Sequence, residues 1–113
     1  MTKYKMAKKQ TPRSKLKKEL DTIFSKYIRL RNSRNEINFC ITCGKVDHWK
    51  NLQCGHFQSR RYLATRWHEQ NCYPQCVSCN IFKSGEQFIF GIQLEKIHGT
   101  GTSIDLTELS RTT

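Results

Sequence analysis

The sequence is poor in acidic residues and proline, and it contains no long apolar segment. Its 113 residues include nine Asp and Glu and two Pro. No stretch has the length and apolarity of a membrane span, and no apolar segment follows the basic first residues as in a secretory signal. These absences lead us to expect a protein of a reducing cytoplasm, where paired cysteines bind metal more often than they form disulfides.

Basic residues are in large excess and are concentrated near the amino end. The 20 Lys and Arg give a formal net charge of +11, and 12 of them lie in residues 1–34, against only Glu19 and Asp21. Such a charge favours a polyanionic partner, of which nucleic acid is the best candidate. A basic, solvated surface without a specific partner would give the same composition.

The chain divides into three segments within one small domain. Residues 1–12 lack apolar periodicity and are predicted to be a flexible basic arm. Residues 13–34 are predicted to form a basic amphipathic helix whose apolar stripe packs on residues 35–113. That stripe consists of Leu16, Leu20, Ile23, Phe24, Tyr27 and Ile28. Lys15 and Lys18 lie on other faces, where they would contact phosphates or simply be solvated.

Two Cys-x-x-Cys pairs predict a zinc site. They lie in "CITCG" and "QCVSCN", and their cysteines are Cys40, Cys43, Cys76 and Cys79. Four thiolates complete a closed, structural tetrahedral site, and in a small domain the bound zinc can contribute about 10 kcal/mol to folding. Two reduced pairs in the core are the alternative. Cys54 and Cys72 are left over and are interpreted as buried free thiols, although either could replace one of the four.

The order of β-type and helical patterns predicts an α+β fold. The runs Ile37–Ile41 and Leu52–Phe57 flank a polar loop, which predicts an antiparallel hairpin. Residues 84–101 have a helical pattern that ends at Gly99, and a short final helix is expected from Thr102.

A closed four-cysteine site has no vacant position for chemistry, so any catalysis needs a second group of residues. His56 could accept a proton from water near neutral pH, Asn80 could offer an amide oxygen to Mg²⁺, and Lys83 could bind a phosphate. Each residue type also has a structural reading: a core histidine, a helix cap and a solvated lysine.

The combined motifs resemble the zinc-containing HNH (ββα-metal) endonucleases and, more closely, the phage NinG/Rap recombination proteins. The resemblance covers about residues 38–99 and centres on "QCGHFQSRRYLATRWHEQNCYPQCVSCNIFKSGEQF". It implies a small zinc-stapled ββα-metal core, with a basic amphipathic helix before it and helices after it.

The resemblance also implies roles for individual residues. His56 matches the general base that activates water, Asn71 the asparagine that orders the loop and orients the base, and Asn80 a ligand of the catalytic divalent ion. Lys83 belongs to the same motif. Three residues occupy places where the family has basic side chains near the active face, with surface charge as the alternative: Arg60, Arg61 and Arg66.

The chain departs from the family pattern at Gln53. The family often has an aspartate three residues before the histidine, and a glutamine oxygen can ligate Mg²⁺ but brings no negative charge. Metal affinity should therefore fall unless another carboxylate contributes, and Glu69 and Glu86 are the nearest candidates along the sequence.

The function implied is metal-dependent hydrolysis of DNA phosphodiester bonds, on branched recombination intermediates, in a phage or prophage setting in the bacterial host cytoplasm. Structural Zn²⁺ and catalytic Mg²⁺ or Mn²⁺ are the expected cofactors, DNA is the expected partner, and a homodimer would suit a cut on two strands. Two alternatives stay open. One is a non-catalytic zinc module that binds DNA, and the other is a small basic RNA-binding zinc protein.

Overall fold

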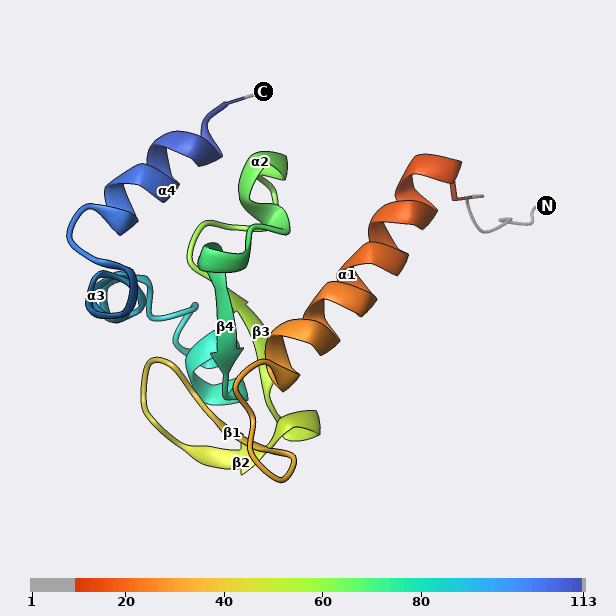
Figure 1. Ribbon diagram of the computed structural model, residues 1–113. Coiled ribbons are helices and arrows are strands. Elements are labelled where there is room, and N and C mark those ends of the chain that lie inside the picture. The colour runs from red at the N-terminus through yellow and green to blue at the C-terminus, as the bar shows by residue number, and fades with distance from the viewer. Residues whose placement is uncertain (1–9, 113) are drawn as a thin grey trace.

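The computed structural model describes residues 10–112 (Figure 1). Its helices and strands, in chain order, are α1 (Pro12–Leu30), β1 (Ile37–Phe39), β2 (Val46–His48), β3 (Gln53–His56), α2 (Leu63–Arg66), β4 (Cys72–Gln75), α3 (Gln87–His98) and α4 (Thr102–Ser110). Short turns of 3-10 helix, η1 (Trp49–Asn51) and η2 (Glu69–Asn71), and a π-helical turn, η3 (Ser78–Phe82), complete the order. The predicted α+β class is confirmed.

Helix α1 begins at Pro12, within the stretch predicted to be an arm. Thr11 caps it, because the Ser14 amide donates to Thr11 Oγ1 at 3.0 Å and Pro12 needs no partner for a missing N–H. The rest of the predicted arm, residues 1–9, lies outside the described residues. The helix ends at Leu30, a few residues before the predicted boundary.

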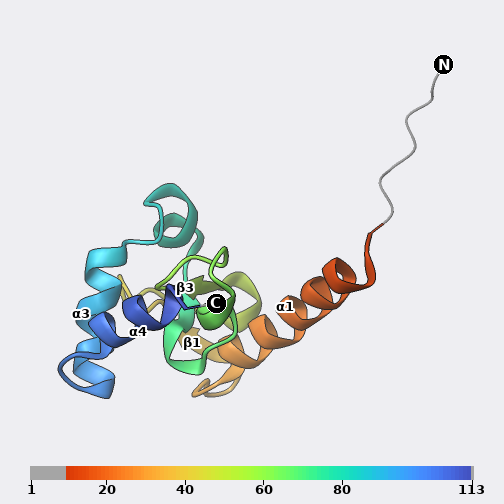
Figure 2. The same cartoon turned by 90° about the horizontal axis from the view of Figure 1, so that it is seen from above.

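Only the carboxy-terminal part of α1 packs on the body of the domain (Figures 1 and 2). Ile28 is fully buried, but Leu16 and Ile23 are 65% and 67% exposed. The expectation that the whole apolar stripe packs is therefore wrong for Leu16 and Ile23. The compact part of the chain lies against the last turns of this long helix and contacts its middle at Asp21, through Arg66 and Trp67.

The two sheets pair differently from the predicted hairpin. β1 pairs antiparallel with β2, and β3 pairs antiparallel with β4. The chain reverses directly after the first cysteine pair, where the Gly44 amide donates to the Cys40 carbonyl at 2.8 Å and Gly44 has a positive φ of 79°. Residues 46–48 thus become the partner of β1, and β3 is left to pair with β4 across a longer connection.

Helices α3 and α4 pack together beside the sheets. The predicted helix after the second cysteine pair is confirmed as α3, which ends before Gly99, and α4 begins at Thr102 as expected. The Glu95 carboxylate joins them by accepting the amide hydrogens of Gly101 and Ser103 at 2.7 and 2.8 Å. Within the described residues, no helix has the length and apolarity required to cross a membrane.

Candidate functional site

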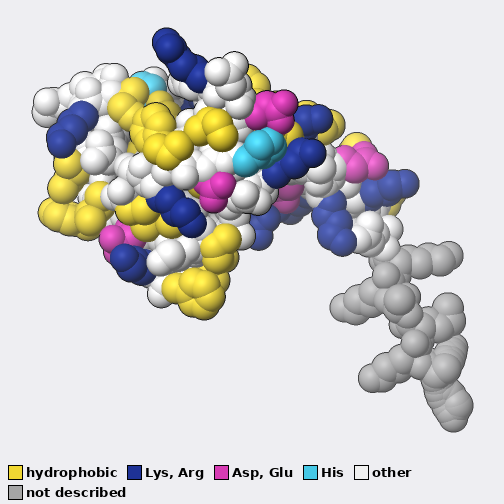
Figure 3. Space-filling model, turned by 90° about the horizontal axis from the view of Figure 1, so that it is seen from below, with side chains coloured by type: hydrophobic (Ala, Val, Ile, Leu, Met, Phe, Trp, Pro, Cys, Tyr) yellow, Lys and Arg dark blue, Asp and Glu magenta, His cyan; other side chains and the backbone are white. Residues whose placement is uncertain are grey.

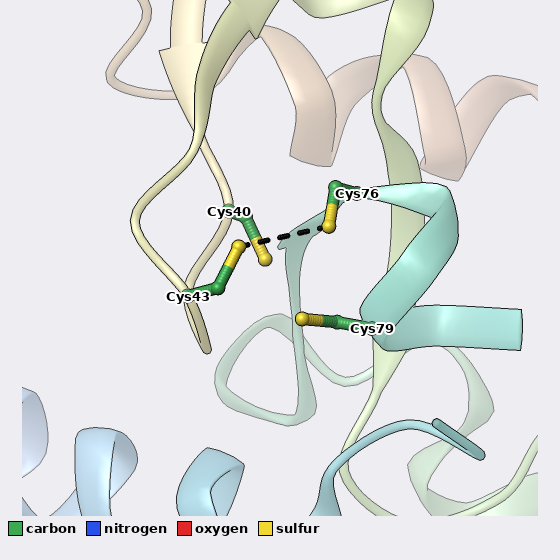
Figure 4. A group of neighbouring side chains, drawn as sticks. All are labelled: Cys40, Cys43, Cys76 and Cys79. Atoms are coloured by element: carbon green, nitrogen blue, oxygen red, sulfur yellow. Dashed lines mark hydrogen bonds between the residues drawn. The ribbon is translucent and has the colours of Figure 1, made fainter. Parts of the chain in front are cut away.

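The four predicted zinc ligands lie in one cluster (Figure 4). Cys40 and Cys43 come from the turn between β1 and β2, and Cys76 and Cys79 come from the end of β4 and from η3. The Sγ atoms of Cys43 and Cys76 are 3.7 Å apart. Tetrahedral zinc with Zn–S bonds of about 2.3 Å places its sulfur ligands about 3.8 Å apart, so this cluster can hold a zinc ion.

Thiolate formation is favoured at one member of this cluster. Burial opposes ionisation of Cys40, but hydrogen bonds from the Thr42 hydroxyl and from the amides of Cys76 and Cys43 outweigh it and lower the pKa of Cys40 to about 6. Burial raises the pKa of Cys79 to about 12. Cys40 is therefore more readily available than Cys79 as a thiolate ligand for an incoming metal.

A cleft of about 650 Å³ lies beside β3, between α1 and η3. His56, Gln53 and Asn80 line it, together with Asp21 of α1. The structure thus brings together three of the residues predicted for catalysis and for the divalent ion. Lys83 is exposed on the turn after η3 and is not part of the cleft wall.

The imidazole of His56 is oriented by a main-chain carbonyl. Its Nε2 lies 2.9 Å from the carbonyl oxygen of Arg66. A neutral imidazole donating through Nε2 carries its lone pair on Nδ1, which makes Nδ1 the basic atom. Burial lowers the pKa of His56, which favours this neutral form.

Asn71 braces the loop that carries this carbonyl. Its side chain is fully buried, its Oδ1 accepts the Gln58 amide at 2.8 Å, and its Nδ2 donates to the carbonyl oxygens of Gln58 and Thr65, both at 3.0 Å. These bonds close the loop over residues 58–65, directly before Arg66. Asn71 is not among the residues that line the cleft.

Gln53 and Asn80 form a hydrogen-bonded pair in the wall of the cleft. Asn80 Nδ2 donates to Gln53 Oε1 at 2.8 Å. Asn80 Oδ1 and the second lone pair of Gln53 Oε1 remain as hard oxygen donors, the ligand type that Mg²⁺ prefers. The pair offers no negative charge.

Neither carboxylate suggested by the sequence lines the cleft. Glu69 accepts a hydrogen bond from the Tyr27 hydroxyl, and Glu86 precedes α3 in a left-handed conformation with φ of 47°. The carboxylate in the cleft wall is Asp21, which sequence reasoning missed. The only signal in the sequence was that Asp21 is one of two acids in a strongly basic segment.

Asp21 is already engaged by side chains of the α2 region. It accepts hydrogen bonds from Arg66 Nε and Nη2 at 3.0 and 2.6 Å and from Trp67 Nε1 at 3.0 Å. The Arg66 hydrogen bond holds the pKa of Asp21 below its ordinary value although burial acts in the opposite direction. Arg66, which is predicted to contact nucleic acid, has its guanidinium paired with Asp21, and its side chain is only 18% exposed.

The other predicted nucleic-acid residues lie on the surface. Arg60 is 62% exposed at the edge of the cleft, 3.8 Å from Asp21, and the guanidinium of Arg61 lies 5.0 Å from the centre of the Tyr62 ring. Lys15 and Lys18 are exposed on the projecting part of α1. Basic side chains gather over this end of the molecule (Figure 3).

The family assignment comes from a comparison over nearly the whole chain. A family model described as bacteriophage lambda NinG protein matches residues 2–108. The chain belongs to the NinG family. The matched residues include α1, both cysteine pairs and the cleft, so the predicted NinG resemblance is confirmed and extends beyond residues 38–99. No curated protein and no solved structure matches the chain.

Proposed function

We propose that this NinG-family protein is a metal-dependent endonuclease that hydrolyses DNA phosphodiester bonds with an HNH-type (ββα-metal) site. The observation that carries the proposal is that His56, fixed by the Arg66 carbonyl, opens onto the same cleft as the Gln53–Asn80 pair. β3, β4 and η3 then correspond to the two strands and the helix of a ββα-metal unit.

In this proposal His56 Nδ1 takes a proton from the attacking water. Asn71 keeps the loop closed and so keeps the base oriented. Mg²⁺ or Mn²⁺ bound by Asn80 and Gln53 would stabilise charge on the phosphate and on the departing 3′ oxygen. These neutral oxygens fit a hard cation but attract it weakly, so we expect activity to need higher Mg²⁺ concentrations than a site with an aspartate.

The zinc cluster and the cleft are adjacent along the chain. Asn80 directly follows the zinc ligand Cys79, and the Asn80 amide donates to the carbonyl of Cys76 at 2.9 Å. A zinc ion in the cluster would therefore fix the turn that presents Asn80 to the cleft. We assign it this structural role and no chemical step.

Arg60, Arg61, Lys15 and Lys18 are the proposed contacts to the DNA backbone, and binding should weaken with salt. Lys83 is exposed and is assigned to a phosphate further from the cleft. Branched recombination intermediates are the proposed substrate and the phage host cytoplasm the proposed setting. A homodimer would place two clefts on two strands.

The direct test is cleavage of labelled linear duplex and four-way-junction DNA by protein loaded with one equivalent of zinc, with and without Mg²⁺ or Mn²⁺. Cutting should require the added ion and should fall by about 100-fold or more in His56→Ala. His98→Gln, a histidine outside the cleft, is the matched control. DNA binding without cutting under either ion would instead identify a non-catalytic zinc module. Preferential RNA binding would favour a small basic RNA-binding zinc protein.

A further inference from the structure

We propose that Cys54, His56 and Cys72 form a second zinc site, separate from the four-cysteine cluster, and that zinc bound there switches off the cleft. The binding part of this proposal stands on geometry alone. The inhibitory part rests on the proposed function, since it assigns a regulator to the same histidine.

The strand register places these three side chains together. His56 of β3 lies directly opposite Cys72 of β4 in the antiparallel pair. Cys54 precedes His56 by two residues, and residues two apart point to the same face of a strand. The three ligand atoms, two sulfur and one nitrogen, accordingly lie within 4.8 Å of one another.

The donor set is suited to zinc and poorly suited to magnesium. Two thiolates and one imidazole are typical of zinc sites in which three protein ligands leave a fourth position for water or another ligand. Thiolate ligands select zinc, whereas amide and carboxylate oxygens suit magnesium. Cys54 and His56 also line the cleft, so the fourth position would face it.

The same cleft is lined by an oxygen site and by part of a sulfur site. Gln53 and Asn80 form the first, and Cys54 and Cys72 flank His56 in the second. Zinc entering the second site displaces the two thiol protons and binds one imidazole nitrogen.

Zinc binding and base catalysis by His56 exclude each other whichever nitrogen is used. Coordination through Nδ1 occupies the lone pair that would accept the proton from water. Coordination through Nε2 breaks the hydrogen bond to the Arg66 carbonyl, which is the contact that orients the ring. In both cases His56 can no longer serve as the base.

Binding can be measured without any cleavage assay. The full chain would be loaded with one equivalent of Zn²⁺ to fill the four-cysteine cluster and then titrated anaerobically with Co²⁺. We expect one further equivalent to bind with a sulfur-to-cobalt charge-transfer band in the near ultraviolet and the visible bands of four-coordinate cobalt. Cys54→Ser, a change at a half-buried side chain, should abolish the charge-transfer band or weaken it to the intensity of a single thiolate, while His98→Gln should leave it intact.

Inhibition is then measured on the same proteins. Micromolar free Zn²⁺ should suppress Mg²⁺-dependent cleavage by the wild type at least tenfold and should leave Cys54→Ser active, because that variant retains His56. Absence of the cobalt band in the wild type, or an unchanged band in Cys54→Ser, would overturn the second site whether or not the protein cuts DNA. A normal cobalt titration in a protein that cuts no DNA would uphold the site and overturn only the proposed function.

Discussion

The carboxylate of Asp21 accepts hydrogen bonds from both Nε and Nη2 of Arg66, at 3.0 and 2.6 Å. The main-chain carbonyl of the same Arg66 holds the imidazole of His56. A single arginine therefore connects α1 to the histidine of the cleft. Asp21 is in this sense a positioning residue, which acts on His56 through the backbone of another residue.

Replacing Asp21 tests this connection. Asp21→Asn removes the ion pair and should lower the free energy of unfolding by about 1–3 kcal/mol, because it weakens hydrogen bonds to a charged partner. Denaturant titration of the zinc-loaded protein measures this. Glu19→Gln, an exposed acid on the same helix, should change stability little. Equal stability of the two variants would show that α1 is not held through Asp21.

Asn71 should be needed for loop closure and not for zinc binding. Asn71→Asp keeps the acceptor for the Gln58 amide but loses both donors to the Gln58 and Thr65 carbonyls, at a cost of about 2–4 kcal/mol. Amide hydrogen exchange over residues 58–66 should rise while the zinc ion of the four-cysteine cluster stays bound. Gln70→Glu makes the same chemical change at an exposed neighbouring residue and serves as the control.

Gly55 should not tolerate even a methyl group. A Cβ at this position would lie 2.1 Å from Gln75 Oε1, and Gln75 cannot move freely because its Nε2 donates to Thr42 Oγ1 and to the Gly85 carbonyl. We expect Gly55→Ala to cost about 1–3 kcal/mol by overpacking. In a Gln75→Ala background the same substitution should cost markedly less. An equal cost in both backgrounds would place the conflict elsewhere.

Arg60 and Arg66 should respond differently to substitution although both are cationic and close to the cleft. Arg60→Gln should reduce the slope of log binding constant against log salt by about one, as for the loss of one phosphate contact. Arg66→Gln should instead destabilise the fold, because its guanidinium is paired with Asp21 and donates to the Arg60 carbonyl. Salt-dependent DNA binding, compared with unfolding curves, separates the two effects.

Loss of zinc from the four-cysteine cluster should be far more damaging than loss of a single surface contact. Cys43→Ser, or a strong chelator, should remove a contribution on the order of 10 kcal/mol to folding. We expect β1, β2 and η3 to unfold together. Thermal melting and hydrogen exchange measure this unfolding. Cys54→Ser should keep the melting temperature close to that of the wild type. Intact β1 and β2 after complete zinc removal would contradict a structural role for the ion.

The cysteine pairs and the helices were accessible to sequence reasoning because their signals are local. Cys40 and Cys43 have the Cys-x-x-Cys spacing that is typical of zinc ligands. Helices α3 and α4 follow from periodicity and from Gly99. The pairing of β3 with β4 was not accessible to sequence reasoning, because nothing local distinguishes β4 from β1 as the partner of β3. The hairpin prediction failed at that choice.

The cleft was predicted only in part for the same reason. His56, Gln53 and Asn80 are tied together by motif spacing, whereas Asp21 and Arg66 are 45 residues apart and meet only through the packing of α1. The grouping of Cys54 and Cys72 with His56 depends on the register of two strands, which spacing along the chain does not specify.

Helix α1 also fixes a length. From Pro12 to Asp21, where the helix meets the cleft, nine residues rise about 14 Å at 1.5 Å per residue. A duplex rises about 3.4 Å per base pair, so this distance corresponds to about four base pairs. An α-helix keeps its length as long as it stays folded. A nucleic acid bound both at the start of α1 and at the cleft would therefore be contacted at two points separated by a fixed distance.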